Sequence, residues 1–349
     1  MAYFLIEAKL KAGLLYKHSS IIEIKEVEKP HIDKGEALVA VRVLGLCGSD
    51  VKIVHKFIEP PYYPFIIGHE IAGELIDALP CNEVERNIIK LIRNCDNNLI
   101  VYLYVGCGVC KYCIKGERNL CHNVRRIGFE INGGLAEYIK VPISNLVPLP
   151  KPLTYDYAVL ADAGATVLRA LKKVKLKPNL NVAVMGVGGL GSLAIQILKI
   201  SGCKIIAFDK KEEKINYAIE LGADIAIDVS NYQKFSGIED NVDIFLDFVG
   251  NKESQILGIN TLRKGGKLLQ VGYTESTLSE IPNKTLVYKE IKIIGSLGNS
   301  INDLYEVIQL AINGYIKSNV TNRYNMEEIN NAITDLKENK ILGRGIINL

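Results

Sequence analysis

The sequence lacks a strong excess of charge of either sign, because 42 Lys and Arg residues face 39 Asp and Glu residues for a net charge of +3. A basic surface for nucleic acid or for a membrane is therefore not predicted. The first residues lack a basic region followed by a long apolar run, and no apolar stretch reaches the length of a membrane-spanning helix. We expect a cytoplasmic protein with no nucleic-acid or membrane partner.

The chain has 349 residues, with 48% hydrophobic and 23% charged, which predicts a soluble protein of two domains. Residues 1 to about 150 contain short β-patterns broken by glycine and proline, such as 37–44 and 99–105. Beyond the prolines at 148, 150 and 152, strands alternate with helices, which favours a parallel sheet. The expected strands are 181–185, 204–208, 223–227, 242–249, 266–271 and 291–295, and the expected helices are 190–201, 302–313 and 326–340.

Four cysteines form a Cys-x2-Cys-x2-Cys-x7-Cys run, and these are Cys107, Cys110, Cys113 and Cys121. This spacing suits a tetrahedral thiolate site for one structural Zn²⁺. Iron–sulfur clusters also use such runs, and a redox dithiol is a weaker alternative because four thiols exceed what it needs. A zinc ion with four protein ligands has no open position for substrate, so we expect the chemistry elsewhere.

A glycine-rich turn follows the first strand of the second half and opens a helix, with Gly186, Gly188, Gly189, Leu190 and Gly191 in its Gly-x-Gly-x-x-Gly pattern. In that context the pattern predicts dinucleotide binding, with the pyrophosphate at the helix N-terminus. Asp209 ends the next strand, where an acid binds the ribose 2′-hydroxyl of NAD and repels the extra phosphate of NADP. The alternatives are a turn without ligand and, for Asp209, an N-cap of a helix over 210–221. Lys210 and Lys211 could partly accommodate the phosphate.

Three further motifs precede this turn, namely Cys47-Gly48-Ser49-Asp50, Gly68-His69-Glu70 and Ala161-Asp162-Ala163-Gly164-Ala165-Thr166. Together with the cysteine run and the glycine-rich turn, they resemble the zinc-dependent medium-chain alcohol dehydrogenase family over essentially the whole chain. The resemblance implies an α/β protein with a GroES-like β-rich catalytic domain at 1–152 that holds the zinc sites. It also implies a Rossmann domain with a doubly wound parallel sheet at 153–296, and a return to the catalytic domain at 297–349.

The resemblance also implies a catalytic zinc held by Cys47, His69 and Asp162, with a fourth position open to water or alcohol. Asp162 stands where the family often has cysteine, and a carboxylate is an accepted zinc ligand; the alternative for it is a helix cap. Glu70 resembles the family acid that orients or transiently binds the metal, and Asp50 resembles a partner behind a ligand. Ser49 resembles the residue that contacts the alcohol oxygen and passes its proton outward.

Four positions resemble coenzyme contacts, with Thr166, Val249 and Val271 at the nicotinamide and Arg344 at the pyrophosphate. A solvated surface charge is the alternative for Arg344. The family implies two zinc ions per chain, NAD, an alcohol, aldehyde or ketone as substrate, and a homodimer or homotetramer. A polyol, sugar or threonine dehydrogenase is the second reading, and a zinc-stabilised nucleotide-binding protein without catalysis is the third.

The sequence departs from the family in three places. Lys52 replaces the histidine usually found in the proton relay, with His55 as another candidate carrier. The segment from Asp77 to Asn98 lacks the usual Gly-Asp-x-Val turn. That segment carries Cys81 and Cys95, which we expect to be free thiols; the alternative is a bridge, if the source is a hyperthermophile.

Overall fold

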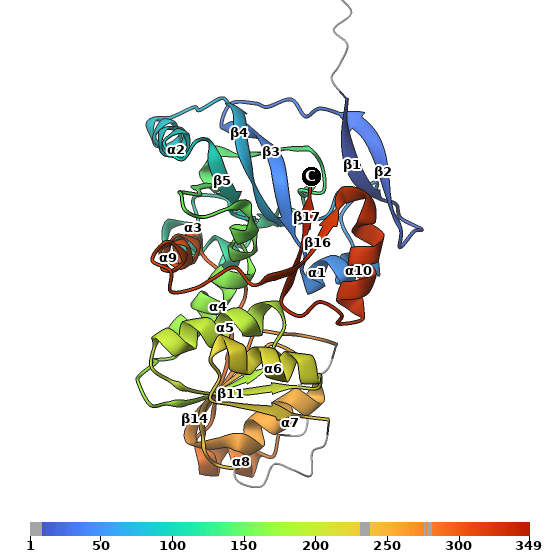
Figure 1. Ribbon diagram of the computed structural model, residues 1–349. Coiled ribbons are helices and arrows are strands. Elements are labelled where there is room, and N and C mark those ends of the chain that lie inside the picture. The colour runs from blue at the N-terminus through green and yellow to red at the C-terminus, as the bar shows by residue number, and fades with distance from the viewer. Residues whose placement is uncertain (1–8, 231–237, 276, 278–280) are drawn as a thin grey trace, which may run out of the picture. The chain divides into compact units, whose positions relative to one another are not determined.

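The computed structural model describes residues 9–230, 238–275, 277 and 281–349, and it divides the chain into two compact units (Figure 1). Unit 1 comprises the chain up to Asp162 together with 300–312 and 320–349, and unit 2 comprises 163–299 with 313–319. Among the described residues, no helix is long and apolar enough to cross a membrane.

A seven-stranded sheet forms the centre of unit 1, with the order β16-β17-β3-β4-β5-β9 and with β8 paired to β3. The C-terminal strand β17 runs antiparallel to β3, so the end of the chain lies in the first unit. Smaller ladders join β1 to β2 and β6 to β7. The strands of this unit are β1 (Lys9–Leu15), β2 (Ile22–Glu28), β3 (Glu36–Gly45), β4 (Glu70–Ala78), β5 (Asn98–Val101), β6 (Tyr104–Val105), β7 (Arg125–Arg126), β8 (Tyr138–Pro142), β9 (Leu146–Pro148), β16 (Val320–Asn325) and β17 (Arg344–Asn348).

The helices of unit 1 are α1 (Gly48–Val54), α2 (Glu83–Arg93), α3 (Lys111–Ile114), α9 (Ile301–Ile312) and α10 (Ile329–Lys337). Helix α2 fills the segment that departs from the family, and it was not predicted. Asn82 caps it by accepting the backbone N–H of Glu85, and Ile89 and Ile92 are buried on its inner face. Two predicted elements are broken: 99–105 becomes β5 and β6, and 326–340 becomes a 3₁₀ turn followed by α10.

Unit 2 is a six-stranded sheet in the order β12-β11-β10-β13-β14-β15, and all of its pairs are parallel. The strand order reverses beside β10, and ligands of such sheets bind beyond the carboxyl ends of the strands at that point. The strands are β10 (Asn181–Met185), β11 (Lys204–Asp209), β12 (Ile225–Asp228), β13 (Val242–Asp247), β14 (Leu262–Gln270) and β15 (Lys292–Gly295). The helices are α4 (Ala163–Lys172), α5 (Gly189–Ile200), α6 (Glu212–Leu221), α7 (Lys252–Thr261) and α8 (Asn283–Lys289).

Candidate active site and metal centres

The four-cysteine run folds into a single cluster around the short helix α3. One sulfur atom from each of the four cysteines lies within 4.8 Å of the others. The Sγ atoms of Cys107 and Cys113 are 4.0 Å apart, close to the ~3.8 Å edge of a tetrahedron with zinc–sulfur bonds of about 2.3 Å. Backbone N–H groups of Val109 and Cys110 lower the pKa of Cys107 to about 6. The donor set and its spacing therefore fit a structural zinc ion.

A second cluster in unit 1 brings together Cys47, His69, Glu70 and Asp162, whose ligand atoms also lie within 4.8 Å of one another. Cys47 precedes α1, His69 directly precedes β4, Glu70 begins β4, and Asp162 closes the first long segment of the unit. Oδ2 of Asp162 lies 3.6 Å from Nε2 of His69 and 4.0 Å from Sγ of Cys47. Zinc ligands at about 2.0–2.3 Å in a tetrahedron are ~3.4–3.8 Å apart, so this cluster also fits zinc.

Buried polar atoms in this cluster have no hydrogen-bond partner in the part of the chain that the structure describes. They include both ring nitrogens of His69, Oε2 of Glu70 and Oδ1 of Asp50. Unpaired buried polar atoms are costly, and a bound cation is one way to satisfy several at once. The orphaned Nε2 of His69 and the acid groups around it therefore support the same fit.

The charges around the cluster are arranged for a cation. Burial alone would lower the pKa of His69, but Asp50 and Asp162 raise it well above its usual range. Burial alone would raise the pKa of Cys47, yet Arg344 and His69 bring it below the ordinary thiol value. The acids thus favour positive charge at this point, and the thiol is disposed to ionise, which a thiolate ligand requires.

Asp50 links the start of α1 to His69. Its Oδ2 accepts the backbone N–H of Cys47 at 2.8 Å, and its Oδ1 lies 3.4 Å from Nδ1 of His69. The carboxylate therefore faces one predicted ligand and anchors the backbone of another, as expected for a group behind a metal ligand. Ser49 lies close by, with Oγ 3.8 Å from Sγ of Cys47.

Arg344 lies in unit 1, on β17, and is 4% exposed. It donates from Nη2 to Oε1 of Glu70, a residue of the metal cluster. The surface-charge alternative for Arg344 is therefore wrong, because its guanidinium is buried in an ion pair. Its contact with a pyrophosphate stays a prediction.

Phe129 was not predicted from the sequence as part of the site. Its ring packs against the ring of His69, with the two centroids 4.9 Å apart. The guanidinium of Arg126 lies over the ring of Phe129, 4.2 Å from its centroid. Tyr104 also senses the charge of the cluster: burial, and then the negative charge of Asp162, raise the pKa of Tyr104 well above its usual range. No local pattern marks these aromatic residues, because only the fold brings them to the ligands.

The glycine-rich turn in unit 2 has the predicted strand–turn–helix geometry. Gly186 has a φ of +89°, a conformation that favours glycine. A Cβ at Gly191 would lie 1.9 Å from the carbonyl oxygen of Gly186, so a side chain there would push strand and helix apart. Helix α5 begins at Gly189 and runs to Ile200. The turn thus presents backbone N–H groups at a helix N-terminus, which suits an anion.

Asp209 ends β11 beside this turn. Its Oδ2 accepts the backbone N–H of Val187 at 2.8 Å, and its Oδ1 accepts those of Lys210 and Lys211. Helix α6 begins at Glu212 with Lys211 as its N-cap, so the alternative of Asp209 as the helix cap is wrong. The carboxylate instead joins the end of β11 to the glycine-rich turn.

Two residues that sequence reasoning missed lie around the predicted coenzyme positions. Lys214 is 6% exposed, its Nζ lies near Gly188, and burial lowers its pKa while Asp209 raises it. Asp247 is fully buried, and its Oδ1 accepts the backbone N–H groups of Val249 and Gly250. The carbonyl of Asp247 accepts the N–H of Val271, so one residue holds both predicted nicotinamide turns. Its place four residues before Asn251, the N-cap of α7, gave no signal.

Thr166 lies on α4, where Oγ1 accepts a hydrogen bond of 3.3 Å from Nδ2 of the buried Asn299. No disulfide joins the described cysteines, and free thiols at Cys81 and Cys95 stay a prediction.

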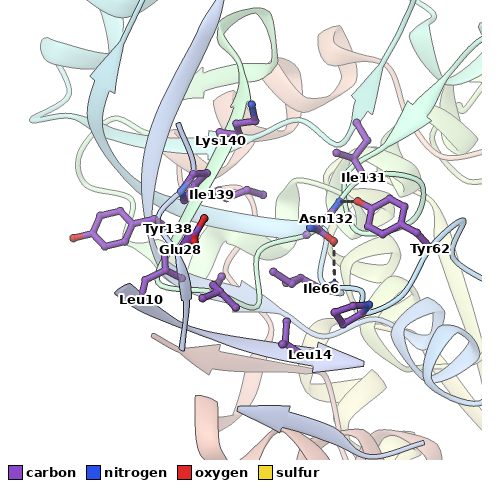
Figure 2. A pocket seen from close by; sticks show the side chains of 15 residues that line it. Leu10, Leu14, Glu28, Tyr62, Ile66, Ile131, Asn132, Tyr138, Ile139 and Lys140 are labelled. Carbon is purple, nitrogen blue, oxygen red and sulfur yellow. Dashed lines mark hydrogen bonds between the residues drawn. The ribbon is translucent and has the colours of Figure 1, made fainter. Parts of the chain in front are cut away.

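A separate cavity of about 430 Å³ opens in unit 1 between β1, β2 and β8 (Figure 2). Its wall is mainly apolar, with Asn132 holding two neighbours: Oδ1 accepts the N–H of Ile66, and the backbone N–H of Asn132 donates to the hydroxyl of Tyr62. None of the predicted ligands lines it, so it carries no part of the site.

Comparison with known proteins agrees with this geometry. Residues 33–151 match the alcohol dehydrogenase GroES-like domain, and residues 189–313 match the zinc-binding dehydrogenase family. An NAD-dependent alcohol dehydrogenase from Sulfolobus acidocaldarius is 32% identical over 97% of this chain and 99% of its own length. A D-arabinose 1-dehydrogenase (NADP⁺) from Saccharolobus solfataricus is 31% identical over 97% of both chains.

The fold agrees with a solved structure over nearly the whole length. An alcohol dehydrogenase from the hyperthermophilic archaeon Aeropyrum pernix has a TM-score of 0.84 and 29% identity, covering 97% of this chain and 100% of that one. Matches to both domains, together with the two metal-ligand clusters and the parallel sheet, place this chain in the zinc-binding medium-chain alcohol dehydrogenase family.

Proposed function

We propose that the protein is an NAD-dependent alcohol dehydrogenase that interconverts an alcohol with its aldehyde or ketone. The observation that carries this proposal is the convergence of Cys47, His69 and Asp162. These three donors come from separate parts of unit 1. With Glu70, the fourth residue of the cluster, paired to Arg344, the fourth position of a tetrahedral ion is left to a small ligand. Such an open site is catalytic, whereas the four-cysteine cluster is closed and structural.

When bound, zinc would lower the pKa of an alcohol hydroxyl, and NAD would accept the hydride from its carbon. Cys47, His69 and Asp162 would hold the metal. Asp50 fixes the ring of His69 through Nδ1 and the backbone of Cys47 through its N–H. Ser49, whose Oγ lies next to the sulfur of Cys47, receives the proton of the alcohol and passes it outward. We assign to Glu70 the role of an acid that orients the site, with Arg344 as its buried partner.

The coenzyme is proposed to bind on unit 2, with its pyrophosphate at the N-terminus of α5. Asp209 supports NAD, because its charge lies beside the glycine-rich turn and would repel a 2′-phosphate. Thr166, Val249 and Val271 would line the nicotinamide. The positive charges of Lys210 and Lys211 would attract the 2′-phosphate of NADP. We therefore expect tighter binding of NAD than of NADP, and not complete exclusion of NADP.

A sugar or polyol dehydrogenase is the second candidate, and the similarity to a D-arabinose dehydrogenase at 31% identity favours it. Both candidates use the same zinc chemistry and differ in the hydroxyl compound that is oxidised. A homodimer or homotetramer and a cytoplasmic location are further expectations from the sequence.

The test is metal analysis combined with an NAD-reduction screen over primary, secondary, cyclic and polyhydric alcohols and aldoses. Asp162→Ala should lose at least about 100-fold in turnover while keeping NADH binding, because the metal and coenzyme residues lie in different units. Asp156→Asn is the control, since Asp156 pairs with Arg323 and is not a member of the ligand cluster. Zinc-loaded protein that oxidises no alcohol or sugar but binds NADH would favour a nucleotide-binding protein without catalysis.

A further inference from the structure

The short segment 313–319 belongs to unit 2, although α9 before it and β16 after it belong to unit 1. Its last residue, Asn319, is 3% exposed. A buried amide needs hydrogen bonds, and Asn319 finds two of them at the beginning of α5.

The amide of Asn319 holds the first turn of α5. Nδ2 donates to the carbonyl oxygen of Gly189 at 2.9 Å and to Oγ of Ser192 at 2.7 Å. Ser192 is fully buried, and its Oγ donates in turn to the carbonyl oxygen of Gly188 at 2.7 Å. A single side chain from a distant part of the sequence therefore fixes the carbonyls of two glycines in the dinucleotide-binding turn.

Few side chains of the glycine-rich turn itself can fix its backbone. Gly188, Gly189 and Gly191 carry no side chains, and glycine loses more conformational freedom on ordering than any other residue. The backbone N–H groups of the turn must nevertheless point at a phosphate in one fixed direction. Holding the carbonyl ends of the same peptide groups restricts the rotation of their N–H ends.

The contacts of Asn319 require an amide. Both partners of Nδ2 accept, because the hydrogen of Ser192 is used toward Gly188. Oδ1 of Asn319 is buried with no hydrogen-bond partner among the described residues. An aspartate of the same shape would place an oxygen against the carbonyl of Gly189 and would compete for the hydrogen of Ser192.

A second pair of bonds attaches the same segment one turn further along α5. The backbone N–H of Lys317 donates to Oε1 of Gln196 at 2.8 Å, and Nε2 of Gln196 donates to the carbonyl of Lys317 at 3.3 Å. Gln196 thus holds the segment without touching the glycine-rich turn, which provides a matched control.

We propose that Asn319 is a positioning residue for the coenzyme pyrophosphate, which it serves by fixing the first turn of α5 through Gly189 and Ser192. This inference rests on the proposed function in one respect, namely that the turn binds a dinucleotide. It adds a residue outside the glycine-rich pattern that determines how tightly the pyrophosphate is bound.

The experiment measures dissociation constants of the zinc-loaded full-length protein for NADH, ADP-ribose and adenosine by fluorescence and competition. Asn319→Ala should weaken NADH and ADP-ribose about tenfold, the value of one lost buried hydrogen bond, and Asn319→Asp should weaken them at least as much. Adenosine, which lacks the pyrophosphate, should bind within about twofold of the unmutated protein. Turnover at saturating NAD should change much less than the KM for NAD.

Gln196→Ala separates positioning from simple attachment of the segment. It should leave NADH binding within about twofold, whereas an equal loss in Gln196→Ala and Asn319→Ala would overturn the proposal. In a double-mutant cycle, Ser192→Ala and Asn319→Ala should be strongly non-additive, while Gln196→Ala and Asn319→Ala should be nearly additive.

The melting temperature of each variant without coenzyme shows whether a loss of binding reflects unfolding, and the Asn319→Asp arm keeps the test open if Asn319→Ala is poorly folded. Unmutated protein that binds no NADH would refute the proposed function. If Asn319→Ala binds NADH as tightly as the unmutated protein does, only the role of Asn319 is refuted.

Discussion

Arg344 donates to Glu70 across β3, and both side chains are buried in unit 1. Strand β3 lies between β17, which carries Arg344, and β4, which begins with Glu70. Gly45 of β3 is the backbone partner of Glu70, and a Cβ at Gly45 would lie 2.3 Å from Oε2 of Glu70. The glycine therefore makes room for an acid that leans over the middle strand toward the arginine.

Removing the arginine should be costly, because it leaves the acid buried without its cation. Arg344→Met is expected to lower the free energy of unfolding by about 3–5 kcal/mol, and adding Glu70→Gln should restore part of the loss. Arg42→Ala is the control: Arg42 of β3 and Glu74 of β4 form an exposed pair, and its loss should cost at most about 1 kcal/mol.

Urea unfolding of the zinc-loaded variants checks this. Equal losses for Arg344→Met and Arg42→Ala would mean that the buried pair contributes no more than a surface pair.

The four-cysteine cluster predicts a zinc ion that stabilises the fold without taking part in turnover. Cys113→Ser should reduce the metal content from two zinc ions per chain to one and lower the melting temperature, since structural zinc contributes folding free energy. NADH binding should be unchanged, because the glycine-rich turn and Asp209 lie in unit 2 and the four cysteines lie in unit 1. Cys203→Ser is a suitable control, as Cys203 is a buried free thiol of unit 2. Two zinc ions in a fully stable Cys113→Ser protein would contradict the assignment.

The parts of the site that the sequence predicted are those with local signals. The glycine-rich turn needs only a strand, a helix and close backbone packing, and the cysteine run closes over a few residues, so both are encoded in short patterns. Cys47, His69 and Asp162 are distant in sequence, and they were recognised by their order in a family pattern and not by spacing.

The rest of the site depends on contacts that only the fold creates. Arg344 and Glu70 are 274 positions apart, and Asn319 and Ser192 are 127 apart. Arginine, glutamate, asparagine and serine are also common on protein surfaces, so no local pattern distinguishes these four residues. Helix α2 is a different case, since the cap Asn82 with Glu85 three residues later, and the spacing of Ile89 and Ile92, are local signals of a helix.

Asp209 should determine the choice between NAD and NADP. Asp209→Gly removes the negative charge and leaves Lys210 and Lys211 beside the same position, so the ratio of kcat/KM values should move toward NADP by at least about tenfold. Part of the effect will be a weaker turn, because Asp209 also accepts the N–H of Val187. Asp209→Asn keeps an acceptor for that N–H and serves as the control for this structural part.

Steady-state kinetics with both coenzymes measure the ratio. Equal efficiency of NAD and NADP in the unmutated protein would already contradict the role of this charge.

The last prediction concerns how the proton leaves the site, because Lys52 stands where a relay histidine is expected. Lys52 lies on α1, where burial lowers its pKa and the nearby Cys47 raises it. His55 caps the C-terminal end of the same helix, and burial followed by the charge of Lys337 lowers its pKa. Both groups are therefore shifted toward the neutral form, in which they could accept a proton.

We nevertheless expect protons to leave from Ser49 through water. Lys52→Met and His55→Ala should each change the rate of alcohol oxidation less than about threefold, whereas Ser49→Ala should lower it about tenfold or more. The rate is measured against pH for the three variants. Because the pKa of Lys52 is lowered, a relay through it would appear as an ionisation below that of an ordinary lysine. A steep loss of rate in Lys52→Met, together with the disappearance of that ionisation, would assign the relay to Lys52 and contradict the water route.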